Sequence, residues 1–157
     1  MKKLSFYALM ILSVLSTRAQ EETYMDEELS TYATVMVWAE AEKGKMTDTY
    51  NDWINSNEVL SAKTFLDIKN AKGDSIEIAN SGASIEEVEA FETIQSKYDS
   101  MTSSFKEVYV GKIKGDIGAG LYNRLKKSLK ADADVKSRYD AIYEGLKSEE
   151  VSEVDTE

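Results

Sequence analysis

Beyond residue 23, apolar residues recur every three or four positions, which is the spacing of one face of an α-helix. The first stripe consists of Leu29, Tyr32, Ala33, Met36 and Ala39, and it continues nearly in phase through Met46, Tyr50, Trp53 and Ile54. We therefore expect one long helix from about residue 25 to 55, opened by a capping-box pair of Thr23 and Asp26. The alternative is a break at Lys43-Gly44-Lys45, which would leave two helices.

The next part of the chain has a weaker pattern. A shorter helix is predicted by the positions of Val59, Ala62, Phe65, Leu66 and Lys69. Lys72-Gly73-Asp74-Ser75 is typical of a turn. After it, Ile76 and Ile78 flank Glu77, an alternation that favours a brief extended stretch.

The clearest helix begins at Ser84, which forms a capping-box pair with Glu87. Its stripe consists of Val88, Phe91, Ile94, Tyr98, Met101, Phe105 and Val108. We expect this stripe to be core, covered by a neighbouring antiparallel helix. The alternative is an exposed seam for a partner helix, either from a second copy or from another protein.

Four glycines between Gly111 and Gly120 predict a loop there. Two further helices follow, marked by Leu121, Leu125 and Leu129 and then by Val135, Tyr139, Ile142 and Leu146. Either Asp132 or Asp134 can cap the last helix. Residues 148–157 contain five acids and no base, so we expect an acidic, disordered tail. The fold class is thus all-α, a small helical bundle of four or five helices over residues 20–147.

Residues 1–19 have the pattern of a cleaved signal peptide. Lys2 and Lys3 precede an uncharged run, residues 4–15, and Thr17 and Ala19 supply small residues before a cut at Gln20. As a helix this run would rise roughly 18 Å, well short of a hydrocarbon core of roughly 30 Å, so a spanning anchor is disfavoured. We therefore expect an exported, periplasmic protein, with an extracellular location as the alternative.

Charge argues against some partners. Removing residues 1–19 takes away three of the 19 basic residues and changes the formal net charge from −10 to −13. Such a surface repels nucleic acid and anionic lipid, so we expect no nucleic-acid partner and no stable membrane insertion of the mature chain. One basic cluster, Arg124, Lys126, Lys127 and Lys130, is more simply the solvated end of a helix.

The residue types also limit the chemistry. The chain has no Cys, His or Pro, so disulfides, the usual zinc ligand set and the usual general base near neutral pH are missing. Several spacings resemble known motifs without their companion residues, and we expect structural roles for all of them: Gly115, Gly118 and Gly120; Asp132, Asp134 and Asp140; Ser103 and Lys106; Glu86 and Glu89; Trp38 and Trp53. We therefore predict no catalytic, cofactor-binding or metal-binding residues.

Two segments resemble a known family. Asp26-Glu27-Glu28-Leu29, with Tyr32 and Ala33, is similar to the first helix of the domain of unknown function 4168, a family of exported bacterial helical proteins. The run from Gly120 to Leu125, with Leu129, Asp132, Val135 and Arg138, is similar to its last helices. The chain departs from that family in its longer middle, residues 56–115, and in lacking a Pro after the final Asp. The resemblance implies an exported helical fold and no particular reaction or cofactor.

The functional expectation is a non-enzymatic envelope protein, acting as a protein-binding or stress-related module. Its partner would be an unidentified envelope protein or a second copy of the chain. The alternative is a hydrolase that relies on carboxylates alone, which would need two of them on either side of a substrate.

Overall fold

The computed structural model describes residues 23–154, with side chains to residue 149, and the expected signal peptide lies outside this range. The described residues form helices and no strand, which confirms the all-α class. There are six α-helices rather than four or five, and a short π-helical segment, η1. They are α1 (Asp26–Asn55), α2 (Ala62–Asn70), α3 (Ser75–Asn80), α4 (Ile85–Lys112), η1 (Ile113–Ile117), α5 (Ala119–Ala131) and α6 (Ala133–Val154).

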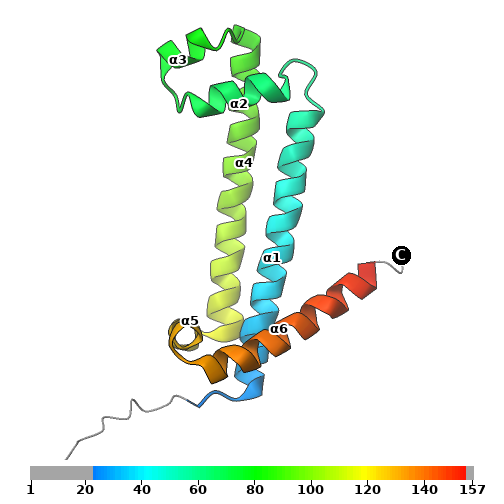
Figure 1. Ribbon diagram of the computed structural model, residues 1–157, viewed down its shortest axis with the longest axis vertical. Coiled ribbons are helices and arrows are strands. Elements are labelled where there is room, and N and C mark those ends of the chain that lie inside the picture. The colour runs from blue at the N-terminus through cyan, green and yellow to red at the C-terminus, as the bar shows by residue number, and fades with distance from the viewer. Residues whose placement is uncertain (1–22, 155–157) are drawn as a thin grey trace, which may run out of the picture.

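Two long antiparallel helices, α1 and α4, form a stalk that separates the two ends of the molecule (Figure 1). α1 is continuous across Gly44, so the long helix is confirmed and the break is not present. The expected cap at Thr23 is wrong: the N-cap is Met25, two residues later, and Glu28 accepts a hydrogen bond of 2.9 Å from the backbone amide of Met25. The acidic residue of the capping interaction is therefore Glu28, the third residue of α1, and not Asp26.

One end of the stalk, which we call the proximal end (residues 23–40 and 109–149), gathers four elements around α1. α6 crosses the start of α1, and α5 lies beside the end of α4 (Figure 1). Their shared core consists of Tyr24, Leu29, Tyr32, Val35, Ile117, Leu125 and Val135. The predicted cap of α6 is confirmed, because Asp132 accepts hydrogen bonds from the amides of Asp134 and Val135 at 2.9 and 3.1 Å.

The expected loop from Gly111 to Gly120 is wrong for most of its length. α4 continues to Lys112, and η1 extends the helical chain to Ile117. Both Ile113 and Ile117 contact the proximal core, so burial of these two side chains favours helix over loop in spite of the glycines. The chain turns only at Gly118, whose φ of 82° lies in the left-handed region that glycine adopts most readily.

The other end is the distal cap (residues 56–90), where α2 and α3 fold over the far tip of the stalk (Figure 1). Here the expected extended stretch is wrong. Asp74 accepts hydrogen bonds from the amides of Ile76 and Glu77, at 2.8 and 3.2 Å, and so begins helix α3. The turn residue thus acts as a helix N-cap, a role that Asp performs well.

The stripe on α4 is divided between the two ends. Ile94 is buried in the core of the distal cap, while Phe91, Tyr98, Met101 and Phe105 are half-buried and Val108 is exposed. Midway along the stalk, Trp38 of α1 stacks on Phe105, with ring centroids 5.9 Å apart. This seam is held by two helices only, which explains why most of the stripe remains partly open to solvent.

α6 runs to Val154, so residues 148–154 are helical where the sequence suggested a disordered tail, and residues 155–157 lie outside the described range. Figure 1 shows the last turns of α6 extending past the stalk. No helix in the described part of the chain combines the length and apolar character needed to cross a membrane.

Candidate interaction surface on the distal cap

The tryptophans do not form a shared platform for a sugar. Trp38 belongs to the seam of the stalk, where the ammonium of Lys112 lies 4.9 Å from its ring centroid. Trp53 packs against the core of the distal cap, nearly at the other end of α1. Each ring therefore contributes to packing between helices.

The other sequence motifs are also dispersed on the structure. Ser103 and Lys106 are exposed on α4, and Glu86 and Glu89 are exposed in its first two turns. Asp140 forms an ion pair with Lys136. Among residues 23–149, no group of three potential metal-binding side chains converges.

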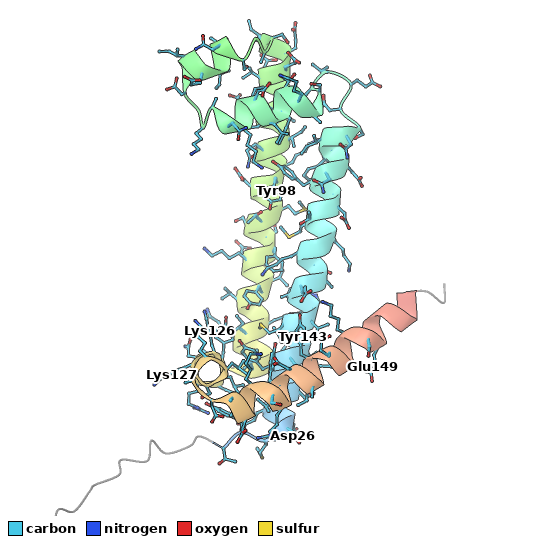
Figure 2. All side chains as sticks on the ribbon, in the orientation of Figure 1. Asp26, Tyr98, Lys126, Lys127, Tyr143 and Glu149 are labelled. Atoms are coloured by element: carbon cyan, nitrogen blue, oxygen red, sulfur yellow. The ribbon has the colours of Figure 1, made fainter. Side chains whose placement is uncertain are left out.

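The basic cluster on α5 faces solvent, as expected for the polar side of a short amphipathic helix. Figure 2 shows Lys126 and Lys127 projecting outward from α5. The ammonium of Lys126 lies 5.7 Å from the ring centroid of Tyr122. These lysines border the proximal core, and Leu125, which directly precedes them, is fully buried.

The distal cap is built around a small core. Leu60, Phe65 and Ile68 come from the 56–61 loop and α2, and Ile94 comes from α4. Phe65 lies 5.1 Å from Phe91, measured between ring centroids. Aromatic pairs at this separation add to the free energy gained from burial alone.

Local hydrogen bonds fix the connections of the cap. The side chain of Asn57 accepts from the amide of Leu60 at 2.7 Å, and Ser61 caps α2 by accepting from Thr64 at 3.1 Å. Ser84 and Glu87 form the predicted capping box at the start of α4, with bonds of 3.2 and 2.9 Å. The bond from the Ser84 amide, followed by one from the Thr64 hydroxyl, holds the pKa of Glu87 below its usual value.

Four large aliphatic side chains on this small cap point to solvent. Their exposed fractions are 55% for Val59, 55% for Leu66, 71% for Ile76 and 77% for Ile85. Single exposed aliphatic residues are common on proteins, but a concentration of them in one small unit is typical of an interaction surface. Three other large hydrophobic side chains are exposed within the described range, Met25, Val108 and Val110, and all lie outside the cap.

Helix geometry explains why Ile76 is exposed. In an extended stretch Ile76 and Ile78 would share one face, because side chains alternate with a period of two. In helix α3 the same two positions lie on nearly opposite sides. Ile78 consequently packs against the cap core while Ile76 faces solvent.

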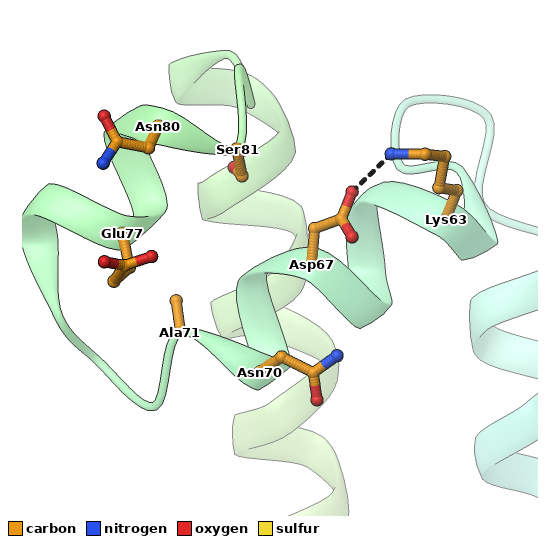
Figure 3. Close-up of a pocket in the computed structure, with 7 residues that line it drawn as sticks. All are labelled: Lys63, Asp67, Asn70, Ala71, Glu77, Asn80 and Ser81. Atoms are coloured by element: carbon orange, nitrogen blue, oxygen red, sulfur yellow. Dashed lines mark hydrogen bonds and ion pairs between the residues drawn. The ribbon is translucent and has the colours of Figure 1, made fainter.

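A polar cavity of about 410 Å³ lies between α2 and α3, and none of the four exposed aliphatic residues lines it. Its lining consists of Lys63, Asp67, Asn70, Ala71, Glu77, Asn80 and Ser81. Figure 3 shows the one ion pair in this lining, in which the Lys63 ammonium lies 2.7 Å from Asp67. That hydrogen bond raises the pKa of Lys63 above its usual value. The cavity offers carboxylate, amide and hydroxyl groups, so it can form hydrogen bonds with a polar group of a partner.

The cap is acidic as a whole. Residues 56–90 contain seven Asp and Glu side chains against three Lys. Asp74 and Glu87 serve as helix caps and Asp67 pairs with Lys63, whereas Glu58 and Glu86 are exposed. The exposed aliphatic residues thus lie in a negative surrounding field.

The sequence pattern does not indicate this surface. It places Leu66 in the stripe of a helix and Ile76 in an extended stretch, and it gives no role to Ile85 or Glu58. The available signal was Asp74 as a possible N-cap before Ile76, which would have placed the two isoleucines on opposite sides of a helix.

Comparison with known proteins adds no identification. No protein-family model, no curated protein and no solved structure matches the chain.

Proposed function

We propose that the protein is a non-enzymatic binding module of the cell envelope that holds a partner protein on its distal cap. The observation that carries this proposal is the concentration of exposed Val59, Leu66, Ile76 and Ile85 on a small acidic unit at the tip of the stalk. Burial of aliphatic surface would supply most of the binding free energy.

Charge specifies the chemistry of the partner. Exposed carboxylates next to apolar side chains, such as Glu58 before Val59 and Glu86 after Ile85, are complementary to a protein surface whose apolar residues are bordered by Lys or Arg. The polar cavity adjoining α2 offers Glu77, Asn70 and Asn80 as hydrogen-bonding groups for such a cation. We expect the association rate to fall as salt is added, because salt screens attraction between exposed charges.

A pull-down from native envelope extract tests the proposal. The test variant carries Leu66→Ser, Ile76→Ser and Ile85→Ser, and the matched control carries Val108→Ser, an equally exposed aliphatic residue on α4 (51%) outside the cap. We expect the wild type and the control to retain the same partner and the triple variant to lose it. Retention by the triple variant, or loss by the control, would contradict the cap as the binding surface.

The location in the envelope is part of the same proposal. It is supported by the leader pattern of residues 1–19, with a cut before Gln20. Intact mass spectrometry of the protein recovered from a fractionated host should give a chain that starts at Gln20, in the periplasmic or extracellular fraction. A chain that keeps residues 1–19 and remains in the cytoplasm would contradict it.

A further inference from the structure

Below the distal cap, a tyrosine of α1 and a tyrosine of α4 touch across the stalk. The ring centroids of Tyr50 and Tyr98 are 4.3 Å apart, with the ring planes tilted by 38°. At this separation the two rings are in van der Waals contact. Figure 2 shows Tyr98 on the upper part of the stalk, on the side of α4 that faces α1.

Neighbouring groups hold the Tyr50 ring in place. Phe65 of α2 meets it edge to face at 5.9 Å, and the ammonium of Lys69 lies 5.6 Å from its centroid. Its hydroxyl donates a hydrogen bond of 3.3 Å to the side-chain oxygen of Gln95. Both tyrosines are nevertheless only half-buried, so each keeps part of its side chain at the surface, where an electron can be removed.

We propose that Tyr50 and Tyr98 form a site of oxidative cross-linking, at which a one-electron oxidant of the peroxidase–peroxide class joins α1 to α4 through a dityrosine bond. The oxidant removes one electron from each phenol, and each hydroxyl releases its proton. The two radicals combine through a carbon–carbon bond between ring positions adjacent to the oxygens. The hydrogens on those two carbons then move to the oxygens, which restores both phenols. The two electrons and two protons convert one hydrogen peroxide to two waters.

The other tyrosine contacts are less suited to this reaction. Tyr32 contacts Tyr122 and Tyr139 with ring centroids 5.6 and 5.7 Å apart, but Tyr32 is only 5% exposed. Burial raises the pKa of Tyr32 to about 12 and also raises the pKa of Tyr139 and of Tyr50, so exposure and ring separation, rather than the pKa, favour the Tyr50–Tyr98 pair. Tyr139 and Tyr143 lie 5.6 Å apart on the same helix.

The cross-link would enclose the distal cap, because the whole chain segment between Tyr50 and Tyr98 contains α2 and α3. Joining two positions far apart in the sequence restricts the unfolded chain, as a disulfide does. The chain has no Cys, so this bond would give the stalk a covalent link that a disulfide cannot supply. The cross-link requires no partner bound to the distal cap.

The test treats dilute purified protein with a haem peroxidase and limiting hydrogen peroxide. We expect dityrosine fluorescence, a monomer that has lost two hydrogens, and a digest in which the peptide of Tyr50 is joined to that of Tyr98. The cross-linked monomer should melt at a higher temperature than the untreated protein. Tyr50→Phe and Tyr98→Phe should each lose the cross-link while keeping the ring, and the control Tyr143→Phe should retain it.

Three outcomes would overturn the proposal: joined peptides that contain other tyrosines, a cross-link that appears only between separate chains, or an undiminished cross-link in Tyr98→Phe. Absence of any dityrosine from the oxidised wild type would overturn it as well. Circular dichroism of each Phe variant checks that the fold is retained, so that a lost cross-link reports on the tyrosine pair.

Discussion

The proximal end and the distal cap are both formed around the ends of α1, but they are held together differently. In the first half of α1 the residues Leu29, Tyr32, Ala33, Val35, Val37 and Ala39 are buried, whereas no residue of α1 after Ala39 is. The proximal end also has polar links between distant parts of the chain. The Tyr24 hydroxyl lies 2.8 Å from Ser128 Oγ, and Arg138 donates to the Tyr24 carbonyl and pairs with Asp26.

The polar links of the distal cap are mostly local. Its helix caps join residues two or three positions apart, and its buried core consists of Leu60, Phe65, Ile68 and Ile94. A region with few buried contacts opens at a lower free energy than the whole molecule does. We therefore expect the proximal end to supply most of the global stability and the cap to open first.

The largest expected effect comes from deleting matched leucines at the two ends. Leu125 at the proximal end and Leu60 in the cap are 0% and 1% exposed. Leu125→Ala should lower the free energy of global unfolding by roughly 2–5 kcal/mol, through lost burial and a new cavity. Leu60→Ala should lower it by less, because the cap can open before the rest unfolds. Denaturant melts of the two variants would measure both losses, and amide hydrogen exchange would show which end of the molecule opens first. Equal global losses would show that the two ends unfold together.

Alkaline pH should weaken the proximal end next. Burial is the main cause that raises the pKa of Tyr32 from 10.0 to about 12, and burial also raises the pKa of Tyr109 and Tyr139. Tyrosines of the unfolded chain release their protons near pH 10, so stability is intact below that pH and is lost as the pH rises toward and through about 12. Thermal melts from pH 8 to 12 would measure this. Tyr32→Phe should make the melting temperature depend less on pH above 10. A pH dependence equal to that of the wild type would contradict the role of the buried Tyr32.

A smaller effect is expected from ion pairs. Arg138→Met removes a pair with Asp26 and a bond to the Tyr24 carbonyl across a long stretch of sequence, and it should cost about 1 kcal/mol. Lys63→Met in the cap removes only an exposed pair within one turn of α2 and should cost less than Arg138→Met. Melts at low and high salt would separate the two variants. A larger loss of stability from Lys63→Met than from Arg138→Met would contradict this order.

The smallest effect on folding should come from the exposed aliphatic residues of the cap. Leu66→Ser and Ile76→Ser should each change the free energy of unfolding by about 0.5 kcal/mol or less, because both side chains face solvent. The same variants should weaken binding to the partner proposed for the cap. A large loss of stability would instead mean that these residues pack in the folded monomer, and the cap would lose its main support as an interaction surface.

The sequence by itself determined the features that depend on neighbouring residues. The helical class, the continuity of α1 and the caps at Ser84 and Asp132 all follow from side chains within one turn of one another or from a repeated spacing. Such signals are local because a helix forms its hydrogen bonds over four residues. For the same reason Gly44 did not interrupt α1, since one glycine within a long, regular stripe costs only about 1 kcal/mol.

Tertiary structure decided the rest. Residues 113–117 are helical because Ile113 and Ile117 reach a core that also contains side chains of α1, α5 and α6. The stripe on α4 is only partly covered because α2 and α6 contact the two ends of the stalk and leave its middle to a pair of helices. Local spacing shows which side of a helix is apolar, but only the arrangement of distant elements determines which apolar side chains are buried. That is why Ile78 is core, Ile76 is surface, and the candidate site could be found only on the folded chain.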